Sequence, residues 1–338
     1  MKKIILSVII LFSIYHVNAQ QKVCVAFYNQ ENLFDTIDNP NKNDAEFLPN
    51  GKYKWNTERY LTKLNQMAKV IASFKNGEGA DFLGMCEVES IEALTDLTKN
   101  KQLQKMAYKT VFFEGEDERG IDNAFIYKSN LVKEAKGYSV VINSEGIGGD
   151  HTRNILVAEI TLKNKEKLYF IVNHWPSRRE GEKESEFKRI FVAGEVRKVC
   201  DEIYAKNANA NIIVMGDLND EPNNMSVTAT LGASGAISKT KNNMLYNTMK
   251  DLSLDGFGSH KFKNEWSMLD QIIISANLLN TKSKVKFIQG SAEVYKQNFM
   301  LETDEKYKGN PLRTFVGNKY LGGFSDHLPV MIFLEISK

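Results

Sequence analysis

The sequence predicts an α+β protein built as a four-layer α/β/β/α sandwich, in which two stacked sheets, mixed or antiparallel, are flanked by helices. Apolar strand-like runs alternate with amphipathic helical segments, which is typical of layered folds. Several of these runs follow one another directly with hairpin-length links, which favours mixed or antiparallel sheets over a purely parallel one. With 338 residues and 42% hydrophobic content, the chain can bury a large core in a single domain.

The first 19 residues differ from the rest and are expected to be a cleaved signal peptide. Lys2 and Lys3 precede an apolar run at 4–14, and Val17-Asn18-Ala19 has the small residues of a cleavage site. The apolar run is too short to span a bilayer, and an uncut membrane anchor is the alternative. The catalytic domain is therefore expected at residues 22–338, secreted or periplasmic after cleavage.

A strand and a long helix open the predicted fold. Thr57 is expected to cap this helix, and Gly77 and Gly79 to end it. Its predicted inward face consists of Leu61, Leu64, Met67, Ala68, Ile71 and Phe74. The other predicted elements of this half are strand 23–28, polar loop 38–56, strand 81–86, helix 91–97, and strands 108–113, 124–127, 138–142, 155–162 and 168–173.

A second long helix, residues 184–205, begins the C-terminal half. Its predicted inward residues are Phe187, Ile190, Phe191, Val196, Val199 and Ile203. Buried strands are predicted at 212–215, 271–274 and 330–334, because each is a short apolar run that ends at polar residues. The Asn- and Gly-rich sequence between these strands predicts no element.

Charge and cysteine content narrow the classes of partner. The chain has 44 basic and 42 acidic residues, and removal of Lys2 and Lys3 leaves 42 of each. Proteins that bind the DNA backbone non-specifically are usually clearly basic. The balanced charge is therefore weak evidence against a nucleic-acid substrate. Three cysteines do not make a disulfide framework. Buried free thiols are expected, with one disulfide as the alternative in an oxidising compartment.

Acidic and amide side chains stand where the apolar strands end. Strand 212–215 leads into Asp217 and Asn219, which are two residues apart and leave the strand end on one side. Such a pair can orient a water molecule and steady a phosphoryl oxygen. Glu31 and Glu87 follow two other strands, and positioned carboxylates of this kind suit Mg²⁺, or alternatively Mn²⁺. No thiolate or paired-histidine spacing indicates structural zinc.

Two histidines also stand at strand ends. His174 follows strand 168–173 and precedes Pro176 and two arginines, which favours a phosphate-facing loop. A core or loop histidine is the alternative. His327 comes just before the last strand, and a carboxylate partner would fix its tautomer and let it act as base or electrophile. Asp270, at the start of strand 271–274, is the candidate partner.

These segments together resemble the endonuclease/exonuclease/phosphatase superfamily, which includes pancreatic-type deoxyribonucleases, abasic-site endonucleases, inositol-polyphosphate phosphatases and bacterial sphingomyelinases. The resemblance covers about residues 23–334. It is carried by five short motifs that occur in the family's order, at 28–35, 85–89, 172–179, 215–222 and 322–329. The resemblance implies that this chain hydrolyses phosphate esters with a divalent metal ion and an activated water molecule.

The resemblance implies roles residue by residue. It assigns catalysis to Asn29, His174, Asp217, Asn219, Asp270 and His327, and metal binding to Glu87, Glu31 and Asp326. Gln30, directly before Glu31, departs from the family pattern, which usually has an apolar residue there. The segments 143–153 and 299–321 have no counterpart in the family pattern. Candidates for a second phosphate contact, with surface ion pairs as the alternative, are Arg119, Arg153 and Arg178.

The leading functional interpretation is a secreted Mg²⁺-dependent phosphodiesterase, with nucleic acid as the expected partner and a nuclease as the expected class. A lipid or small-molecule phosphoesterase is the first alternative, because Tyr246, Phe257, Phe262 and Trp266 could form an aromatic membrane surface. A non-catalytic binding protein is the second alternative, although such a protein would be expected to lack one of the key acids or histidines. No protein partner is implied.

Overall fold

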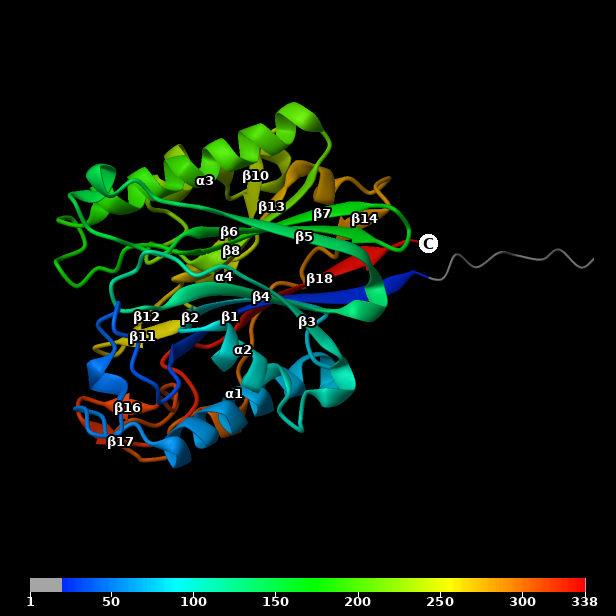
Figure 1. Ribbon diagram of the computed structural model, residues 1–338. Coiled ribbons are helices and arrows are strands. Elements are labelled where there is room, and N and C mark those ends of the chain that lie inside the picture. Colours follow the sequence, from blue (N-terminus) through cyan, green and yellow to red (C-terminus); the bar gives the residue numbers. More distant parts are fainter. Residues whose placement is uncertain (1–19, 338) are drawn as a thin grey trace, which may run out of the picture.

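The structure is a computed structural model that describes residues 20–337. It confirms the predicted four-layer sandwich: helix α3 (Glu186–Lys206) covers one large sheet, and helices α1 (Thr57–Gly77) and α2 (Ile91–Thr98) cover the other (Figure 1). The predicted signal peptide, residues 1–19, lies outside the described residues. Within 20–337, none of the helices combines the length and apolar character that crossing a bilayer needs.

The first sheet is mixed and has seven strands. Along its path the order is β14 (Val285–Phe287), β18 (Val330–Ile336), β1 (Gln21–Leu33), β2 (Phe82–Val88), β4 (Asp122–Lys128) and β3 (Tyr108–Phe112), and β15 (Glu293–Val294) pairs with β18. Only the pair β1 and β2 is parallel among these seven strands. Parallel pairing brings the carboxyl ends of β1 and β2 to the same edge of the sheet.

The second sheet also has seven strands. Their order is β5 (Val132–Val140), β6 (Ile155–Leu162), β7 (Lys167–His174), β8 (Asn211–Asp217), β13 (Asp270–Ser275), β10 (Leu245–Asn247) and β9 (Ala233–Ser234). The strands β7 and β8 run parallel, whereas β13 runs antiparallel to β8. The ends of β7 and β8 and the start of β13 therefore lie at one edge.

The core is divided by the two sheets into three apolar layers. In β1, Val25 and Phe27 pack between the sheets, whereas Ala26 and Tyr28 pack under the helices α1 and α2. This alternation follows from the two-residue period of a strand. Gly84 in β2 brings the sheets together, because a Cβ there would lie 2.4 Å from Met215 Sδ. Both faces of the central strands are buried, so their ends are rigidly supported.

The long helices differ from the prediction in three details. Asn56, not Thr57, caps α1, because the Asn56 side chain accepts the Arg59 backbone N–H at 3.0 Å. Phe187 is 50% exposed rather than inward, since it lies nine residues from the buried Val196 and so on the opposite side of α3. Leu61 is also exposed, at the margin of the buried stripe of α1.

Small elements fill the segments for which no element was predicted. They are α4 (Lys250–Leu254) and two hairpins, β11 (His260–Phe262) with β12 (Glu265–Ser267) and β16 (Phe315–Val316) with β17 (Lys319–Tyr320). Short 3-10 turns lie at 45–47, 104–106, 129–131, 144–147, 237–239, 276–279 and 298–300, and a π-helical turn at 226–230. The three cysteines are buried and unpaired, which confirms the expectation of free thiols.

Candidate active site

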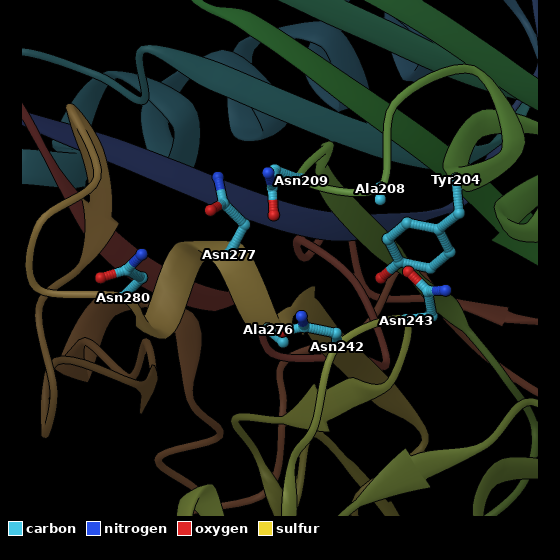
Figure 2. A pocket seen from close by; sticks show the side chains of 8 residues that line it. All are labelled: Tyr204, Ala208, Asn209, Asn242, Asn243, Ala276, Asn277 and Asn280. Atoms are coloured by element: carbon cyan, nitrogen blue, oxygen red, sulfur yellow. The ribbon is translucent and has the colours of Figure 1, made fainter.

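Two pockets lie at opposite edges of the second sheet. Figure 2 shows one of about 60 Å³, lined by Tyr204, two alanines and five asparagines, beside the start of β8 and the end of β13. It is much smaller than typical ligand sites, which exceed about 300 Å³. A cavity of about 720 Å³ opens at the other edge. The predicted residues that line it are Glu87, Arg119, Arg153, His174, Arg178, Asp217, Asn219, Asp326 and His327.

Strand register brings the predicted residues together. Asn29 in β1 pairs with Cys86 of β2, the residue before Glu87. His174 of β7 and Asp270 of β13 both pair with Asp217 of β8, one from each side. Asn29 and Asp217, which are 188 positions apart in the sequence, thereby come into hydrogen-bond contact. The site therefore combines strand ends from both sheets.

Asn29 connects the two central carboxylates. Its side-chain amide donates to Asp217 Oδ2 at 3.1 Å and lies 3.5 Å from Glu87 Oε1. The other oxygen of Glu87 accepts the Asn32 backbone N–H at 2.8 Å. One oxygen of Glu87 is thus fixed by the backbone, and the other faces the cavity region shared with Asp217.

Four residues of the site have left-handed backbone. The φ angles are 48° at Glu31, 59° at Asn32, 61° at Glu87 and 49° at Asn219. This region is sparsely populated by residues that carry a Cβ, and each instance costs about 1–3 kcal/mol. The pairing of β1 with β2 is irregular at the first three of these positions. Such strain concentrates at functional sites, which supports a functional role for this edge.

Asp217 is held at the end of β8 by its own loop. The Asn219 backbone N–H donates to Asp217 Oδ1 at 3.0 Å, and the Asn219 amide donates to the Trp175 carbonyl at 3.0 Å. Gly216 is required just before it, because a Cβ at that position would lie 2.3 Å from the Asn173 carbonyl oxygen. Burial raises the pKa of Asp217 to about 7. The group can therefore exchange a proton near neutral pH.

His327 lies between two carboxylates. Its Nδ1 is 2.6 Å from Asp270 Oδ2, and its Nε2 is 3.8 Å from Asp217 Oδ2. This confirms that Asp270 and His327 are partners in space, as the sequence predicted. Burial alone would lower the pKa of His327, but the charges of Asp270 and Asp217 outweigh it and raise the pKa well above its usual value. The imidazole is therefore protonated at neutral pH.

His174 approaches the same carboxylates from β7. Its Nε2 lies 3.7 Å from Asp217 Oδ2 and 3.9 Å from Glu87 Oε1. Burial lowers the pKa of His174 well below its usual value, and the nearby charge of Arg153 lowers it further. The two histidines therefore differ in charge, although both face Asp217: His327 is cationic and His174 is neutral.

The other two predicted metal ligands already have protein partners. Glu31 Oε2 accepts the Thr314 backbone N–H at 2.7 Å, and Asp326 forms an ion pair with Arg313. Burial raises the pKa of Glu31 to about 7. Asp326 is only partly buried, and although burial raises its pKa, His327 and Arg313 lower that pKa to about 2. Among the described residues, the one basic side chain within 4.0 Å of the Glu87 carboxylate is His174, at 3.9 Å.

This donor set fits a divalent metal ion. Glu87 Oε1 and Asp217 Oδ2 are both reached by the same Asn29 amide group and by the same His174 nitrogen. Two carboxylates that converge in a partly buried site repel each other unless a cation lies between or beside them. Oxygen donors of this kind suit Mg²⁺ or Mn²⁺.

The three candidate arginines have different surroundings. Arg153 is buried, and it donates to the Trp175 carbonyl at 2.7 Å and to Asp117 at 3.3 Å. Arg119 faces Asp117 only at 3.8 Å, so most of its donors are available to the cavity. Arg178 lines the cavity but directs its donors to the Asn219 carbonyl at 2.5 Å and to Asp220 at 3.2 Å. Its contacts support the loop that carries Asn219.

Sequence reasoning missed several residues of this region. His260 lines the cavity and its ring lies 4.7 Å from that of His327, but it belongs to the segment with no predicted element. Arg313 comes from segment 299–321, where no motif identified it. Asp220 is fully buried and was quoted in the motif 215–222 without a role. Its position directly after Asn219 was the available signal.

A family model and several solved structures resemble this chain in sequence pattern or in fold. A family model described as "Endonuclease/Exonuclease/phosphatase family" matches residues 24–336. No curated protein matches the sequence. Among solved structures, an endonuclease/exonuclease/phosphatase family protein from Bacteroides thetaiotaomicron is similar, with a TM-score of 0.57, 16% identity, and coverage of 95% of this chain and 100% of that chain.

Two further structures have the same fold. The mannosyl-6-phosphatase of Bacteroides thetaiotaomicron VPI-5482 has a TM-score of 0.55 and 17% identity, with 92% of this chain and 99% of that chain covered. D. rerio TDP2 in complex with a single-strand DNA product has a TM-score of 0.54 and 16% identity, with 93% and 98% covered. At such identities the likeness establishes the fold alone.

Proposed function

Since the chain belongs to the endonuclease/exonuclease/phosphatase family and is therefore a phosphoesterase, we propose that it is a Mg²⁺-dependent phosphodiesterase that cleaves nucleic acid. The observation that carries this proposal is the position of Asp217. Its Oδ2 lies 3.1 Å from the Asn29 amide and 3.7 and 3.8 Å from two histidine nitrogens, on the floor of an open cavity.

The proposed metal ion is Mg²⁺, with Mn²⁺ as a substitute. Glu87 is its proposed principal ligand, and the other two predicted carboxylates, Glu31 and Asp326, border the site with partners of their own in Thr314 and Arg313. When bound there, the ion polarises a phosphoryl oxygen as a Lewis acid. Oxygen ligands and the absence of any cysteine among the cavity-lining residues favour a hard cation over zinc.

Asp217 is the proposed general base. As a carboxylate it accepts a proton from a water molecule at Oδ2, and the Asn29 and Asn219 side chains help to fix the water and the phosphoryl group. A base whose pKa lies near the working pH is effective in proton transfer, and burial gives Asp217 that property. The water then attacks phosphorus in line with the leaving oxygen.

The two histidines stabilise charge in the transition state. Asp270 holds His327 through Nδ1, so Nε2 is free to donate to a phosphoryl oxygen. His174 is neutral and can donate from Nε2 to a second oxygen, provided that this nitrogen carries the proton. Oriented donors in a partly buried site stabilise developing negative charge without reorganisation.

The cavity supports a substrate larger than one phosphate group. Its volume is about 720 Å³ and Arg119 and Arg153 line one wall, where they are the proposed contacts for a second phosphate. Arg178 is the third proposed contact, although its main role is expected to be support of the Asn219 loop. The structural similarity to D. rerio TDP2, whose structure contains a single-strand DNA product, favours nucleic acid.

The proposed location is outside the cytoplasm, either secreted or periplasmic. This rests on the pattern of the first 19 residues, in which two lysines precede an apolar run and a small-residue cleavage site.

A small-molecule or lipid phosphoesterase is the second candidate. Phe257 and Phe262 are 56% and 63% exposed, and Phe262 lines the cavity, so an apolar substrate group could contact it. Tyr246 is buried and does not contribute to such a surface. The similar fold of a mannosyl-6-phosphatase also keeps phosphomonoesters among the candidate substrates.

Turnover of plasmid DNA, RNA, sphingomyelin, mannose 6-phosphate and bis-p-nitrophenyl phosphate, each with Mg²⁺ and with EDTA, tests the proposal. We expect hydrolysis of DNA or RNA that EDTA abolishes. Asp217→Asn should lower kcat by about 10²- to 10⁴-fold without loss of fold, because it removes the general base. Asp201→Asn, on the exposed side of α3, is the matched control.

Near-normal turnover by Asp217→Asn would refute the mechanism. Preference for sphingomyelin or mannose 6-phosphate over both nucleic acids would replace the proposed substrate class but keep the mechanism.

A further inference from the structure

The segment 299–321 forms part of the wall of the candidate active site. Its hairpin β16–β17 packs on the loop before α1, where the ring of Phe315 lies 4.7 Å from Tyr53 and 6.0 Å from Trp55. Lys63 of α1 is fully buried and donates to Thr314 Oγ1 at 2.8 Å. These contacts fix the backbone at residues 313 and 314 firmly against the body of the protein.

Arg313 is thereby held between two predicted metal ligands. Its guanidinium forms an ion pair with Asp326, and its Nε lies 3.8 Å from Glu31 Oε1. The next residue, Thr314, donates its backbone N–H to the other oxygen of Glu31 at 2.7 Å. The Arg313 side chain is 34% exposed and lines the cavity, so it borders the same space as Glu87.

We propose that Arg313 acts as a built-in cation between Glu31 and Asp326, and that it restricts the protein to one divalent metal ion, held at Glu87. This inference rests on the metal dependence proposed above. A guanidinium is charged at all accessible pH values, so Arg313 keeps its positive charge beside these carboxylates. Two cations a few ångströms apart repel strongly in a partly buried site.

The surroundings of the two carboxylates argue for the same assignment. Glu31 has a second cation, Lys63, 3.9 Å from Oε2, in addition to the Thr314 N–H. Asp326 forms an ion pair with the Arg313 guanidinium. Because both groups are already neutralised by fixed side chains, a metal ion gains less from them than from Glu87.

Mn²⁺ binding followed by electron paramagnetic resonance tests this role without reliance on turnover. We expect the wild-type protein to bind one Mn²⁺. Arg313→Ala and Arg313→Gln should each bind a second Mn²⁺, or bind the first with a dissociation constant that is lower by about tenfold or more. The reason is that a positive charge has been removed. Arg313→Lys keeps the charge and should behave like the wild type.

Arg59→Ala is the matched control. Arg59 stacks on Tyr320 of the same hairpin at 4.4 Å, so its loss loosens the packing of the segment without removing charge from the site. The glutamine variant, which keeps polar contacts, serves if the alanine variant does not fold. Circular dichroism identifies folded variants.

Unchanged or weaker Mn²⁺ binding in both Arg313→Ala and Arg313→Gln would overturn the inference. So would two Mn²⁺ ions bound by the wild type, or tighter binding in Arg59→Ala equal to that in Arg313→Ala. No Mn²⁺ binding by the wild type would refute the proposed metal dependence itself, together with this inference.

Discussion

The central residue, Asp217, shows how burial and charge act against each other. It is almost fully buried, which favours the neutral acid and raises its pKa to about 7, yet His327 favours the carboxylate. His327 is in turn kept cationic by Asp270 and Asp217. Acid and base functions in one site commonly depend on environments that shift pKa values apart in this way.

Replacement of Asp270 by asparagine should change the pH dependence of catalysis. The carboxylate of Asp270 helps to raise the pKa of His327, whereas burial lowers it. Without that charge His327 loses its proton at a lower pH, so the alkaline limb of the kcat/KM profile should move to lower pH. At neutral pH kcat should fall by roughly 100-fold.

The pH–rate profile of Asp270→Asn against the wild type and Asp201→Asn measures this effect. An alkaline limb at the same pH in all three proteins would show that Asp270 does not control the protonation of His327.

At the scale of elements, helix α3 holds the loop that follows β8. Arg189 is fully buried, and its Nε lies 2.7 Å from Asp220 Oδ1. Ser226 donates to the other oxygen of Asp220 at 2.5 Å, and Arg178 approaches from the cavity side at 3.2 Å. Asp220 directly follows Asn219, so this cluster couples the position of the helix to the active-site loop.

Arg189→Met should lower the free energy of unfolding by about 3–5 kcal/mol, since it leaves the buried Asp220 without its closest cation. In the double variant Arg189→Met with Asp220→Asn, the loss should be smaller than the sum of the two single losses. Urea denaturation of the four proteins measures the coupling. Additive losses would mean that the two side chains do not stabilise each other.

Most of the elements could be predicted from the sequence because their apolar residues repeat with a clear period. Strand 155–162 was predicted with the bounds that the structure gives, and the two long helices within two residues at each end. The segment 218–269 could not be predicted in this way. Its small elements depend on side-chain contacts with distant residues, such as Gln271 with the Asp220 carbonyl at 2.6 Å.

The residues of the candidate site also differ in whether they could be predicted from the sequence. Asp217 and His174 could be found because each directly ends an apolar strand, and the register then makes them neighbours. Arg313 and His260 could not, because Arg313 precedes the two-residue strand β16 and His260 begins the three-residue strand β11, and such short elements reach the site only through tertiary packing. Asp270 was proposed as the partner of His327 from its position at the start of a strand, and the structure confirms the contact.

At the scale of the whole molecule, the two sheets bring Glu87 and Asp217 together, with the Asn29 amide 3.5 Å from Glu87 Oε1 and 3.1 Å from Asp217 Oδ2. In the folded state these carboxylates are held together by the sheets, whereas in the unfolded chain they separate. A ligand that binds only the folded state stabilises it in proportion to the logarithm of its concentration. Metal binding should therefore raise the stability of the entire fold.

Addition of Mn²⁺ or Mg²⁺ at about 100 times the dissociation constant should stabilise the wild type by about 2.7 kcal/mol, which raises Tm by several degrees. Glu87→Gln should lose most of this increase, because it removes the principal ligand. Thermal unfolding followed by circular dichroism, with Glu92→Gln on helix α2 as control, makes the comparison. The same rise in Tm for Glu87→Gln would remove Glu87 from the metal site.

The close approach of the sheets at Gly84 and Met215 has a consequence for the chemistry. Asn29 and Glu87 belong to one sheet, and His174, Asp217 and Asp270 belong to the other. A larger side chain at that seam would slide one sheet relative to the other and pull the two halves of the reaction centre out of alignment, while each sheet stayed intact. The geometry of the site therefore depends on the alignment of the two sheets at this seam, in addition to the stability of each sheet.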